Sequence, residues 1–591
     1  MLEPRFRWLF PPPVALDPRF VAVGARLGLG NRALEVLKRR GLDTAELETW
    51  VGPAEAGLCD PGLLPDAVIF VERIRAAIAA GDPVLVFGDF DADGLTGLAI
   101  LCRTFVRLGI DARPYVPSRV EEGHGLSLPA LDAAVAMGAA LIVTVDCGTS
   151  SREEIAEAVR RGIDVIVTDH HRVPAELPPA LALVNPHRPD SRYPHRRLAG
   201  SGVAFKLAQL LLADEAGGPA AAMDLVDLAT IGTVADVSPI LGENRSIARL
   251  GLDRMRSDPR SGVAALLSRS GAAGARISLE TVSFALAPRI NAAGRMGDAM
   301  DAAHLLLTDD PDEAERLADR LDVANVARRQ LTRDVVEDAE AAITALEVPA
   351  DARAVVVRGP WPVGIVGLVA ARIAERRGLP AVVGAQSGES IRASCRSGPG
   401  IDLAEALGSC ADLLVRHGGH RGAAGFEIAA EHWDAFAGRF HAIAAAAIPA
   451  DVRPELTLDL VVEAIDVDYR LLAELAGLAP TGPGNPEVLM AVRGLTVTRV
   501  RAANGGHAQL TLRRRVDVLD GIAFNRPDLA EVLREGDRVD VAARLTSRVY
   551  GGNESLQLEI RDVAISGTHA RMPLAEAGPT ALATAVGAVQ S

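Results

Sequence analysis

The strongest constraint on the fold comes from three short apolar runs, each of which ends abruptly in polar residues. Val84–Phe87, Leu141–Val145 and Val165–Val167 are rich in β-branched residues, and helix-like patterns separate them. Short runs that are apolar throughout are typical of strands buried on both faces of a parallel sheet. The alternation of such strands with helices therefore predicts a doubly wound α/β domain.

Acidic side chains and two imidazoles follow directly after these strands. The carboxyl ends of neighbouring parallel strands lie along one edge of a sheet, where such folds bind their ligands. So many like charges require cations between them, and oxygen-rich sites with one or two imidazoles suit Mn²⁺ or Mg²⁺. Paired ions of this kind hydrolyse phosphodiesters. The residues expected to gather are Asp89, Asp91, Asp93, Asp146, Asp169, His170 and His171, with Asp236 at what reads as a fourth strand end.

Composition narrows the class of protein. The 591-residue chain is 49% hydrophobic and has a formal net charge of −15, which taken alone argues against a nucleic-acid-binding protein. Net charge is weak evidence, because clustered arginines can still form a positive groove. The five cysteines have no paired spacing, which favours a reducing cytoplasm and argues against zinc. Because no apolar run has the length of a membrane span, no membrane association is expected.

The order of patterns divides the chain into six regions. The long, charge-paired stretch Pro311–Leu346 predicts a helix that connects two lobes. Beyond Pro454, five short strands with Gly and Asn turns fit a barrel of the OB type. The predicted regions are an N-terminal extension (1–65) with one helix near 31–40, the first α/β domain (66–300), the connector (301–350), a smaller α/β domain (351–450), the barrel (451–566) and a disordered tail (567–591).

Two local expectations concern how the polar residues are presented. A helix over Thr96–Leu108 is expected to begin after the acidic turn, which would leave Asp91 and Asp93 on one face at the strand end. A second helix is expected over Leu403–His417. The glycines that follow it fit a loop that approaches phosphate, and they also fit a capped helix end.

The ordered motifs resemble the DHH phosphoesterase superfamily, which is named for the residues matched by Asp169, His170 and His171. Longer matches between residues 65 and 565 are to its RecJ family of single-strand-specific 5′→3′ exonucleases. The matching segments are Tyr115–Arg119 with Glu122–Leu126, Leu198–Lys206, Gly232–Asp236 with Gly242–Arg245, Pro288–Met296 and Gly418–Gly425. The resemblance implies a DHH domain, joined by the long helix to a smaller DHHA1 domain and followed by the OB barrel.

The resemblance also implies roles for individual residues. Asp146 would bridge two Mn²⁺ or Mg²⁺ ions, His171 would face the scissile phosphate, and Asp169 would orient an imidazole. The other implied metal ligands are Asp91, Asp93, His170 and Asp236, with Asp89 as a third ligand or outer partner. The implied pocket for the 5′ phosphate consists of Arg119, Ser394 and Arg396, and further backbone contacts fall to Arg289, Asn291, Arg295, Gly419 and His420.

The barrel and one loop give further expectations. Single-strand-binding barrels combine a basic groove with aromatic rings on which bases stack. The residues expected to supply these are Phe524, Arg544, Arg548 and Tyr550, with added charge from Arg513, Arg514 and Arg515; the alternative for Phe524 is a core position. The loop after Arg119 departs from the family, because His124 stands where a tyrosine is usual.

These features imply a single-stranded-DNA-specific 5′→3′ exonuclease that releases 5′-mononucleotides and acts in recombination and DNA repair. One alternative is a DHH-family phosphodiesterase of short oligonucleotides, cyclic dinucleotides or pyrophosphate, and another is a non-catalytic binder. A channel built from the sheet edge, both lobes and the barrel would exclude a duplex by its width. The expected partners are single-stranded DNA with a 5′ end, a single-strand-binding protein and a helicase, and a monomer is expected.

Overall fold

The structure is a computed structural model that describes residues 2–119, 121–272, 277–346, 352–449, 453–550 and 553–568, without the side chains of Val549, Tyr550 and Asn553. Within this part of the chain, no helix combines the length and the apolar character needed to cross a membrane. The chain separates into two compact units. Among the described residues, one unit consists of those from Pro53 to Ile448, and the other joins those up to Gly52 with those from Pro449 onward.

The larger unit contains a five-stranded parallel sheet in the order β3-β2-β4-β5-β6. The register places Gly88 beside Val145 and Val145 beside Thr168, so the ends of three central strands are level. This confirms the predicted parallel sheet and the expected alignment of its strand ends along one edge. The strands are β2 (Val84–Gly88), β3 (Ala112–Tyr115), β4 (Leu141–Val145), β5 (Asp164–Thr168) and β6 (Ala182–Val184).

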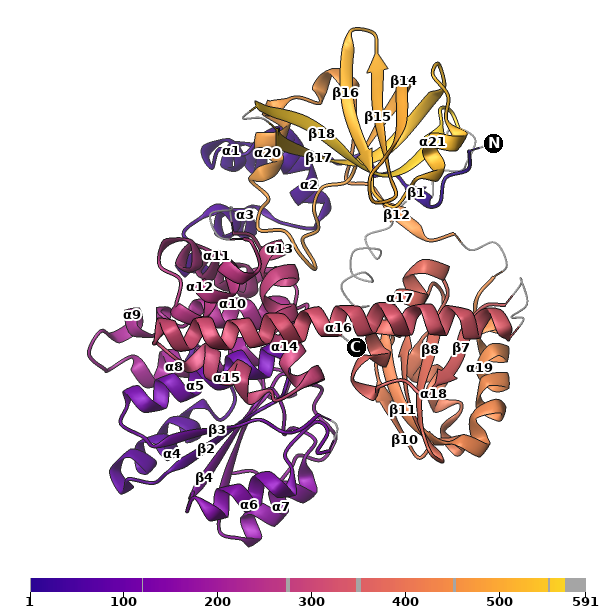
Figure 1. The fold of residues 1–591 in the computed structure, drawn as a ribbon. Coiled ribbons are helices and arrows are strands. Elements are labelled where there is room, and N and C mark those ends of the chain that lie inside the picture. Colours follow the sequence, from indigo (N-terminus) through magenta and orange to yellow (C-terminus); the bar gives the residue numbers. More distant parts are fainter. Residues whose placement is uncertain are drawn as a thin grey trace. The chain divides into compact units, whose positions relative to one another are not determined.

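Alternate residues of these strands enter two separate cores. Val84 and Val86 pack under α4, α5 and α8, whereas Leu85 and Phe87 pack under α6 and α7 on the opposite face (Figure 1). Burial on both faces explains why these strands read as unbroken apolar runs. The helices are α4 (Ala67–Ala80), α5 (Ala92–Arg107), α6 (Leu128–Ala136), α7 (Arg152–Arg160) and α8 (Gly200–Leu212).

A group of helices follows α8 and carries further site residues. Among them, α10 packs against α5, α8 and α11, and is buried along almost its whole length. These helices are α9 (Gly218–Met223), α10 (Val226–Ala235), α11 (Gly242–Ser257), α12 (Ser261–Arg269), α13 (Leu279–Thr281), the π-helical turn η3 (Val282–Leu286), α14 (Ala287–Met296) and α15 (Met300–Leu307).

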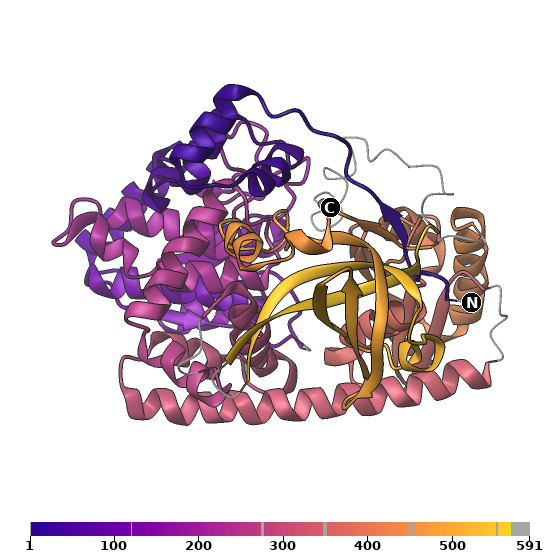
Figure 2. The same ribbon diagram turned by 90° about the horizontal axis from the view of Figure 1, so that it is seen from above.

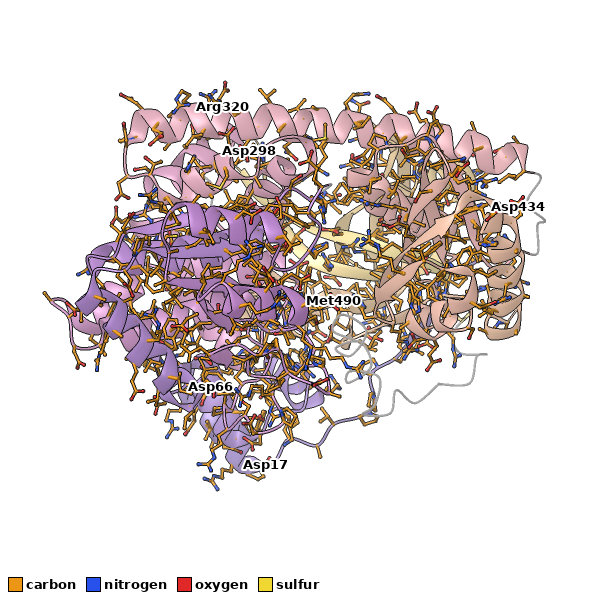
Figure 3. All side chains as sticks on the ribbon, turned by 90° about the horizontal axis from the view of Figure 1, so that it is seen from below. Asp17, Asp66, Asp298, Arg320, Asp434 and Met490 are labelled. Carbon is orange, nitrogen blue, oxygen red and sulfur yellow. The ribbon has the colours of Figure 1, made fainter. Side chains whose placement is uncertain are left out.

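A single 35-residue helix, α16 (Pro311–Ala345), joins the two lobes of this unit, as predicted. The Asp310 carboxylate caps its start by accepting a hydrogen bond from the amide of Asp312. The helix packs first on α12, α14 and α15 and then on α17 and β7, and Figures 1 and 2 show it as an unbroken rod. Arg320 on its outer side, labelled in Figure 3, pairs with Asp301 of α15 at 3.1 Å.

The second lobe has a five-stranded mixed sheet in the order β10-β11-β9-β8-β7. The helix predicted over Leu403–His417 is wrong after Gly408, because the amide of Val415 donates to the carbonyl of Glu427 and the chain continues as a strand beside β11. The elements are β7 (Val355–Gly359), α17 (Val363–Arg377), β8 (Ala381–Ser387), β9 (Ser390–Arg396), α18 (Leu403–Gly408), β10 (Arg416–Gly419), β11 (Ala423–Ala429) and α19 (Trp433–Ala447).

The smaller unit is built on the predicted five-stranded barrel. Strands β14, β15, β16, β18 and β17 pair in succession, and β14 also pairs with β17, which closes the barrel. A short strand, β13 (Leu460–Val462), adds to β14. The others are β14 (Met490–Ala503), β15 (His507–Arg514), β16 (Asp517–Ala523), β17 (Arg538–Tyr550) and β18 (Asn553–Ile565), with helices α20 (Tyr469–Ala476) and α21 (Asp528–Val532).

The predicted N-terminal extension (1–65) divides between the units, since its part up to Gly52 belongs to the barrel unit and its part from Pro53 to the larger unit. The first part is richer in structure than predicted. Strand β1 (Arg7–Leu9) pairs in parallel with β12 (Glu455–Thr457). The expectation of one helix is wrong, because α1 (Pro18–Arg26) and α3 (Thr44–Val51) accompany α2 (Asn31–Arg39). The predicted tail lies outside the described residues from 569 onward.

Candidate metal centre and nucleic-acid-binding residues

Asp91 lies at the start of α5 and not on β2. Its Oδ1 accepts hydrogen bonds from the amides of Asp93 at 3.0 Å and Gly94 at 3.1 Å, so it is the N-cap of the helix. The predicted helix start at Thr96 is therefore wrong by about one turn. An acidic residue before a helix is a capping signal. At Asp91 this signal decides the local structure, although the spacing of Asp91 and Asp93 had suggested the end of a strand.

Asp93, in the first turn of α5, reaches across to the N-terminus of α8. Its carboxylate accepts hydrogen bonds from the amides of Gly200 at 2.6 Å and Ser201 at 3.0 Å. Gly232 of α10 makes room for this contact, because a Cβ there would lie 2.3 Å from Asp93 Oδ1 and 2.1 Å from Ser201 Oγ. The orientation of Asp93 is therefore set by two other helices.

Asp146 follows β4 in the left-handed backbone region, with φ at 61°. Residues other than glycine rarely adopt this conformation, and when they do so it is frequently at a functional site. His170 Nε2 lies 3.0 Å from Asp146 Oδ1 and 3.9 Å from both Asp93 Oδ2 and Asp236 Oδ1. Three predicted carboxylate ligands thus converge on one imidazole nitrogen.

Asp236 reaches this cluster from a helix, so the predicted fourth strand end is wrong. It caps the C-terminus of α10, and its Oδ2 accepts a hydrogen bond from Ser238 Oγ at 2.6 Å. The preceding run Ile231–Val234 is apolar because α10 is buried among three other helices, and a helix buried all round is apolar all round. Periodicity alone does not separate such a helix from a buried strand.

Asp169 stands behind the two histidines. It accepts hydrogen bonds from the amides of Thr149, His170 and His171 and from Nδ1 of His171 at 2.8 Å. Burial acts against its ionisation, but the bond from His171 and the charges of both histidines outweigh burial and hold the pKa of Asp169 below its ordinary value. Burial lowers the pKa of His171, but the hydrogen bond to Asp169 and the charges of Asp169 and Asp146 together outweigh burial and raise it to about 9.

The carboxylates repel one another, and two of their buried oxygens lack a hydrogen-bond donor among the described residues. Burial, together with the charges of Asp93 and Asp91, raises the pKa of Asp146 well above its ordinary value. Burial, Asp89 and Asp93 raise the pKa of Asp91 to about 6. In the described part of the chain, Asp89 Oδ1 and Asp146 Oδ1 are buried without a hydrogen-bond donor, since His170 is close to the latter but makes no hydrogen bond to it. Such groups fit bound cations.

The donor atoms form overlapping sets that suit two ions. Within each set, one ligand atom from each residue lies within 4.8 Å of the others, and Asp146 belongs to two of the three sets. Carboxylate oxygens with imidazole nitrogens match Mn²⁺ or Mg²⁺. Burial raises the pKa of the neighbouring Cys147 thiol, so that residue offers no thiolate. The sets are Asp89 with Asp91 and Asp146, Asp93 with His170 and Asp236, and Asp146 with His170 and His171.

Arg119 and His124 both rest on the ring of Phe90 beside this cluster. The guanidinium of Arg119 lies 4.4 Å from the ring centroid, and the His124 ring lies 4.5 Å from it. His124 Nδ1 is 3.2 Å from Asp89 Oδ2. The residue that departs from the family pattern therefore occupies an aromatic contact next to the acidic edge.

Four arginines of this unit are partly buried without a carboxylate partner among the described residues. Burial, together with the charges of Arg119, Arg328 and Arg396, lowers the pKa of Arg295 to about 9. Arg295 Nη1 donates only to the carbonyl of Gly364 at 2.9 Å, and Arg328 donates to Asn325 Oδ1 at 2.7 Å. Mutual repulsion of this kind favours an anion. Sequence reasoning missed Arg328, because on the charged helix α16 it reads as one surface arginine among many.

Ser394 and Arg396 lie together on β9. Both approach Gly367 of α17, where a Cβ would lie 3.1 Å from Arg396 Nη2 and 3.5 Å from Ser394 Oγ. Gly419 ends β10 with φ at 139°, and His420 Nδ1 accepts a hydrogen bond from the amide of Gly422 at 3.2 Å. Because β10 is a strand, the capped-helix reading of these glycines is wrong.

Two predicted substrate contacts have internal partners. Arg289, which is 8% exposed, donates to Asp322 Oδ1 and to the carbonyl of Ala285. Asn291 Oδ1 accepts a hydrogen bond from the amide of Ala92 at 2.8 Å. They hold α14 against α16 and against the start of α5, so their contact with substrate stays a prediction that rests on the resemblance.

The predicted DNA-binding residues of the barrel differ in their exposure and in whether they already form ion pairs. Phe524 is 46% exposed and meets His507 edge-on at 5.0 Å, so it is not a core residue. Arg544 pairs with Glu487 at 2.5 Å, and Arg548 lies 3.9 Å from Asp520. The side chain of Tyr550 lies outside the described part of the structure. Their contact with DNA stays a prediction.

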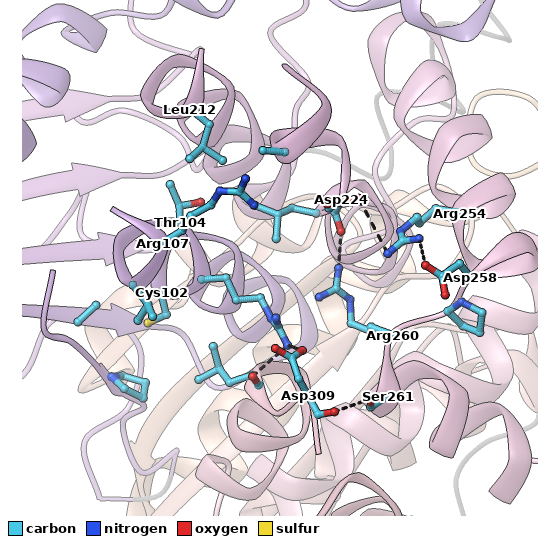
Figure 4. A pocket seen from close by; sticks show the side chains of 18 residues that line it. Cys102, Thr104, Arg107, Leu212, Asp224, Arg254, Asp258, Arg260, Ser261 and Asp309 are labelled. Carbon is cyan, nitrogen blue, oxygen red and sulfur yellow. Dashed lines mark hydrogen bonds and ion pairs between the residues drawn. The ribbon is translucent and has the colours of Figure 1, made fainter. Parts of the chain in front are cut away.

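A cavity of about 670 Å³ lies in the larger unit, beside α5, α11 and the start of α12 (Figure 4). Its cations are already paired, as Arg254 is with Asp258 at 2.5 Å and Arg260 is with the carbonyl of Asp224. Its described lining contains none of the predicted site residues.

Three family profiles match the chain in the order of its domains. The DHH family, N-terminal domain, matches residues 83–233. The DHHA1 domain matches residues 351–446. The RecJ OB domain matches residues 458–562. The first match contains five of the six predicted metal ligands that follow Phe87, and Asp236 lies just beyond its end.

Curated relatives and a solved structure extend this likeness over nearly the whole chain. Single-stranded-DNA-specific exonuclease RecJ of Bacillus subtilis (strain 168) is 35% identical over 573 residues, which are 96% of this chain and 72% of that protein. The protein of the same name from Thermus thermophilus is 36% identical over 566 residues, covering 95% and 79%. The crystal structure of RecJ from Thermus thermophilus in complex with Mn²⁺ aligns with a TM-score of 0.80 at 32% identity, covering 97% of this chain and 81% of that one. On this evidence, together with the three domain matches in order, the chain belongs to the RecJ family.

Proposed function

We propose that this protein is a metal-dependent exonuclease that degrades single-stranded DNA from its 5′ end and releases 5′-mononucleotides. The observation that carries the proposal is the convergence of Asp93, Asp146 and Asp236 on Nε2 of His170 at the carboxyl edge of the parallel sheet. The names of the RecJ relatives and the Mn²⁺ in a related structure support the same activity and cofactor.

The cluster of carboxylates and histidines at the carboxyl edge of the parallel sheet would hold two Mn²⁺ or Mg²⁺ ions. Asp146 would be shared between them, since its carboxylate belongs both to the set with Asp89 and Asp91 and to the set with the two histidines. When bound, such a pair of ions supplies a nucleophilic water at neutral pH and stabilises charge on the entering and leaving oxygens of the phosphodiester. The remaining ligands would be Asp91, Asp93, His170 and Asp236, with Asp89 as a further ligand or an outer partner.

Asp169 and His171 would act on the scissile phosphate as a pair. The 2.8 Å hydrogen bond to Asp169 fixes the ring of His171 through Nδ1 and leaves the other ring nitrogen for substrate. The His171 side chain is 59% exposed, so a phosphate can reach it. His171 would thus contribute positive charge next to the ions, and Asp169 would keep the ring in place.

The partly buried arginines would recognise the strand end. Arg119 and Arg295 belong to the cluster that lacks carboxylate partners, and Arg396 lies beside Ser394. Planar guanidinium groups bind terminal phosphates through paired hydrogen bonds. A pocket of this kind for a 5′ phosphate would set the direction of degradation. Gly419 and His420, with Arg289 and Asn291, would contact the backbone that follows.

The barrel would add the preference for single strands, through base stacking on the half-exposed Phe524 and through phosphate contacts. The role in recombination and DNA repair calls for a helicase that opens duplex ends and for a single-strand-binding protein. We propose a monomer in the cytoplasm, and the five unpaired cysteines support a reducing environment.

The proposal is tested with a 5′-phosphorylated single strand, the same strand blocked at its 3′ end, and a blunt duplex, each with Mn²⁺ or with EDTA. Mononucleotide release from both single strands, with Mn²⁺ only and with the duplex spared, is expected. If neither single strand is degraded, the exonuclease proposal fails, and cyclic dinucleotides and pyrophosphate become the substrates to test.

A further inference from the structure

An ion pair in the interior of the DHH domain has no part in the proposed reaction. Lys206 Nζ lies 2.9 Å from Glu243 Oε1, and both side chains are fully buried. Among the 62 basic residues of the chain, Lys38 and Lys206 are the two lysines. A lysine ammonium is compact and offers three donors, whereas a guanidinium is planar and larger. In a chain that uses arginine almost everywhere, this buried position therefore depends on the shape of lysine.

Glu243 joins four separate segments at one point. Its Oε1 accepts hydrogen bonds from Lys206 of α8 and from the amide of Cys59 at 2.9 Å. Its Oε2 accepts a hydrogen bond from the hydroxyl of Tyr193, at 2.6 Å, in the segment that leads into α8. Lys206 also donates to the carbonyl of Cys59 at 2.7 Å. The network therefore fastens α8 and α11 to each other and to two connecting segments.

The helices joined by this pair enclose α10, which carries Asp236 at its end. Ser201 Oγ of α8 donates to the carbonyl of Ala229 at 3.3 Å, and Thr230 Oγ1 donates to the carbonyl of Ile247 of α11 at 2.8 Å. The N-terminal amides of α8 also hold the carboxylate of Asp93. The spacing of α8 and α11 thus decides how far Asp93 and Asp236 stand from His170.

We propose that the buried network of Lys206, Glu243 and Tyr193 is a positioning device for the metal centre, which sets the separation of Asp93 from Asp236. Replacing a buried ion pair by apolar side chains of similar volume is often neutral for stability. What apolar packing loses is the fixed geometry that hydrogen bonds impose. That the centre binds Mn²⁺ or Mg²⁺ rests on the proposed function, whereas the hydrogen-bonded connection between α8 and α11 does not.

The test removes the polar network without leaving a buried charge. The full-length triple variant Lys206→Met, Glu243→Met, Tyr193→Phe is compared with the wild type by thermal unfolding, by calorimetric titration with Mn²⁺, and by kcat and KM on single-stranded DNA. We expect a folded protein with Mn²⁺ affinity weakened by about tenfold, as for other partners that orient metal ligands. We also expect the triple variant to have a lowered kcat and an unchanged KM for single-stranded DNA.

A second buried ion pair provides the matched control. The pair consists of Arg260 and Asp227, whose side chains are 8% and 0% exposed. Asp227 lies at the opposite end of α10 from Asp236, about 14 Å away along the helix. The double variant Asp227→Met, Arg260→Met should keep the Mn²⁺ affinity of the wild type. If the control loses Mn²⁺ affinity as strongly as the triple variant does, the effect is general destabilisation and the inference fails.

Two further outcomes separate the inference from the proposed function. A folded triple variant with the Mn²⁺ affinity and kcat of the wild type would show that the network is purely structural. If the triple variant does not fold, Tyr193→Phe alone should still weaken Mn²⁺ binding a few-fold, and an unchanged affinity would overturn the inference. A wild type that binds no Mn²⁺ would instead contradict the proposed function.

Discussion

Asp146 is the residue at which the two halves of the acidic cluster meet. Its left-handed backbone places a buried oxygen, which lacks a hydrogen-bond donor, 3.0 Å from His170. Strain at one backbone position costs on the order of 1–3 kcal/mol and persists where the surroundings enforce it. Here β4 and the N-terminus of α8 enforce it, since a Cβ at Gly200 would lie 2.5 Å from that of Asp146.

Replacing Asp146 by Asn should abolish nuclease activity and leave DNA binding intact. Loss of one preorganised charged group typically costs about 10²–10³-fold in rate, and a shared ligand should be at the upper end. Mononucleotide release and single-strand affinity are measured on the same variant. The exposed Asp214, paired with Arg75 at 3.1 Å, provides the control Asp214→Asn. Substantial activity in the Asp146 variant would remove Asp146 from the reaction.

The metal-free protein should lose stability as the pH rises from 4 to 7. The pKa of Asp91 is raised from 3.8 to about 6, and that of Asp146 is raised in the same direction, so the folded state binds protons more tightly than the unfolded state. For Asp91, that stabilisation is complete below pH 3.8 and is lost as the pH passes 6. Mn²⁺ at 100 times its Kd should restore about 2.7 kcal/mol per site at pH 7.5.

Thermal unfolding with Mn²⁺ or EDTA at pH 5 and pH 7.5 checks this prediction. The increase in Tm caused by Mn²⁺ should be larger at pH 7.5, where protons no longer compete for the carboxylates. An equal increase at both pH values would mean that the cluster does not bind the ion.

The sequence was sufficient to place those site residues that directly follow the ends of strands. Asp89 and Asp146 directly follow β2 and β4, so alternation and register place them correctly. Arg328 was not predictable, because its importance comes from its charge acting on Arg295, which folding brings near it. No local pattern distinguishes it from the exposed arginines of α16.

Helix α10 is the element whose packing controls the site most directly. It lies against α5, α8 and α11 and holds Asp236 at its end, and its Gly232 is where it passes closest to Asp93. Glycine in a helix is usually about 1 kcal/mol less favourable than alanine. At this position the close approach explains why glycine is present.

Gly232→Ala should therefore destabilise the protein, although alanine is the better helix former. A Cβ there would lie 2.1 Å from Ser201 Oγ and 2.3 Å from Asp93 Oδ1, and overpacking of this kind costs about 1–3 kcal/mol. Mn²⁺ affinity should also fall, because Asp93 must move. Gly438→Ala in α19, where the new Cβ meets nothing within 4 Å, should stabilise by up to about 1 kcal/mol.

Denaturant unfolding and Mn²⁺ titration of both variants test this pair. If Gly232→Ala behaves like Gly438→Ala, then α10 does not constrain the metal centre. The segment of α10 was wrongly predicted as a strand because it is buried on every side and so lacks the polar face that marks a surface helix. The same burial lets it constrain the metal centre.

At the scale of the whole molecule, the chain forms two units, and the N-terminal residues belong with the barrel. The buried carboxylate of Asp562 on β18 accepts hydrogen bonds from Trp8 Nε1 at 2.8 Å and from the amides of Arg5 and Phe6. Arg526 lies 3.5 Å from it. Contacts between residues more than 500 positions apart leave no trace in local sequence, so the extension read as a separate region.

Asp562→Ala should release the N-terminal strand from the barrel. Removing one partner from a buried, hydrogen-bonded charge network costs about 3–5 kcal/mol. Hydrogen exchange of β1 and β12 should become much faster, while the exchange of β2 and β4 in the other unit should not change. The exposed Glu535→Ala provides the control. Unchanged protection of β1 would show that Asp562 does not anchor it.

The central claim is that one sheet edge binds two divalent ions, and a crystal structure with Mn²⁺, located by its anomalous scattering, tests it most directly. We predict two Mn²⁺ peaks at this edge, with the Asp146 carboxylate between them and His170 and Asp236 at one of the pair. Peaks elsewhere, or no Mn²⁺ at this edge at saturating concentration, would contradict the account.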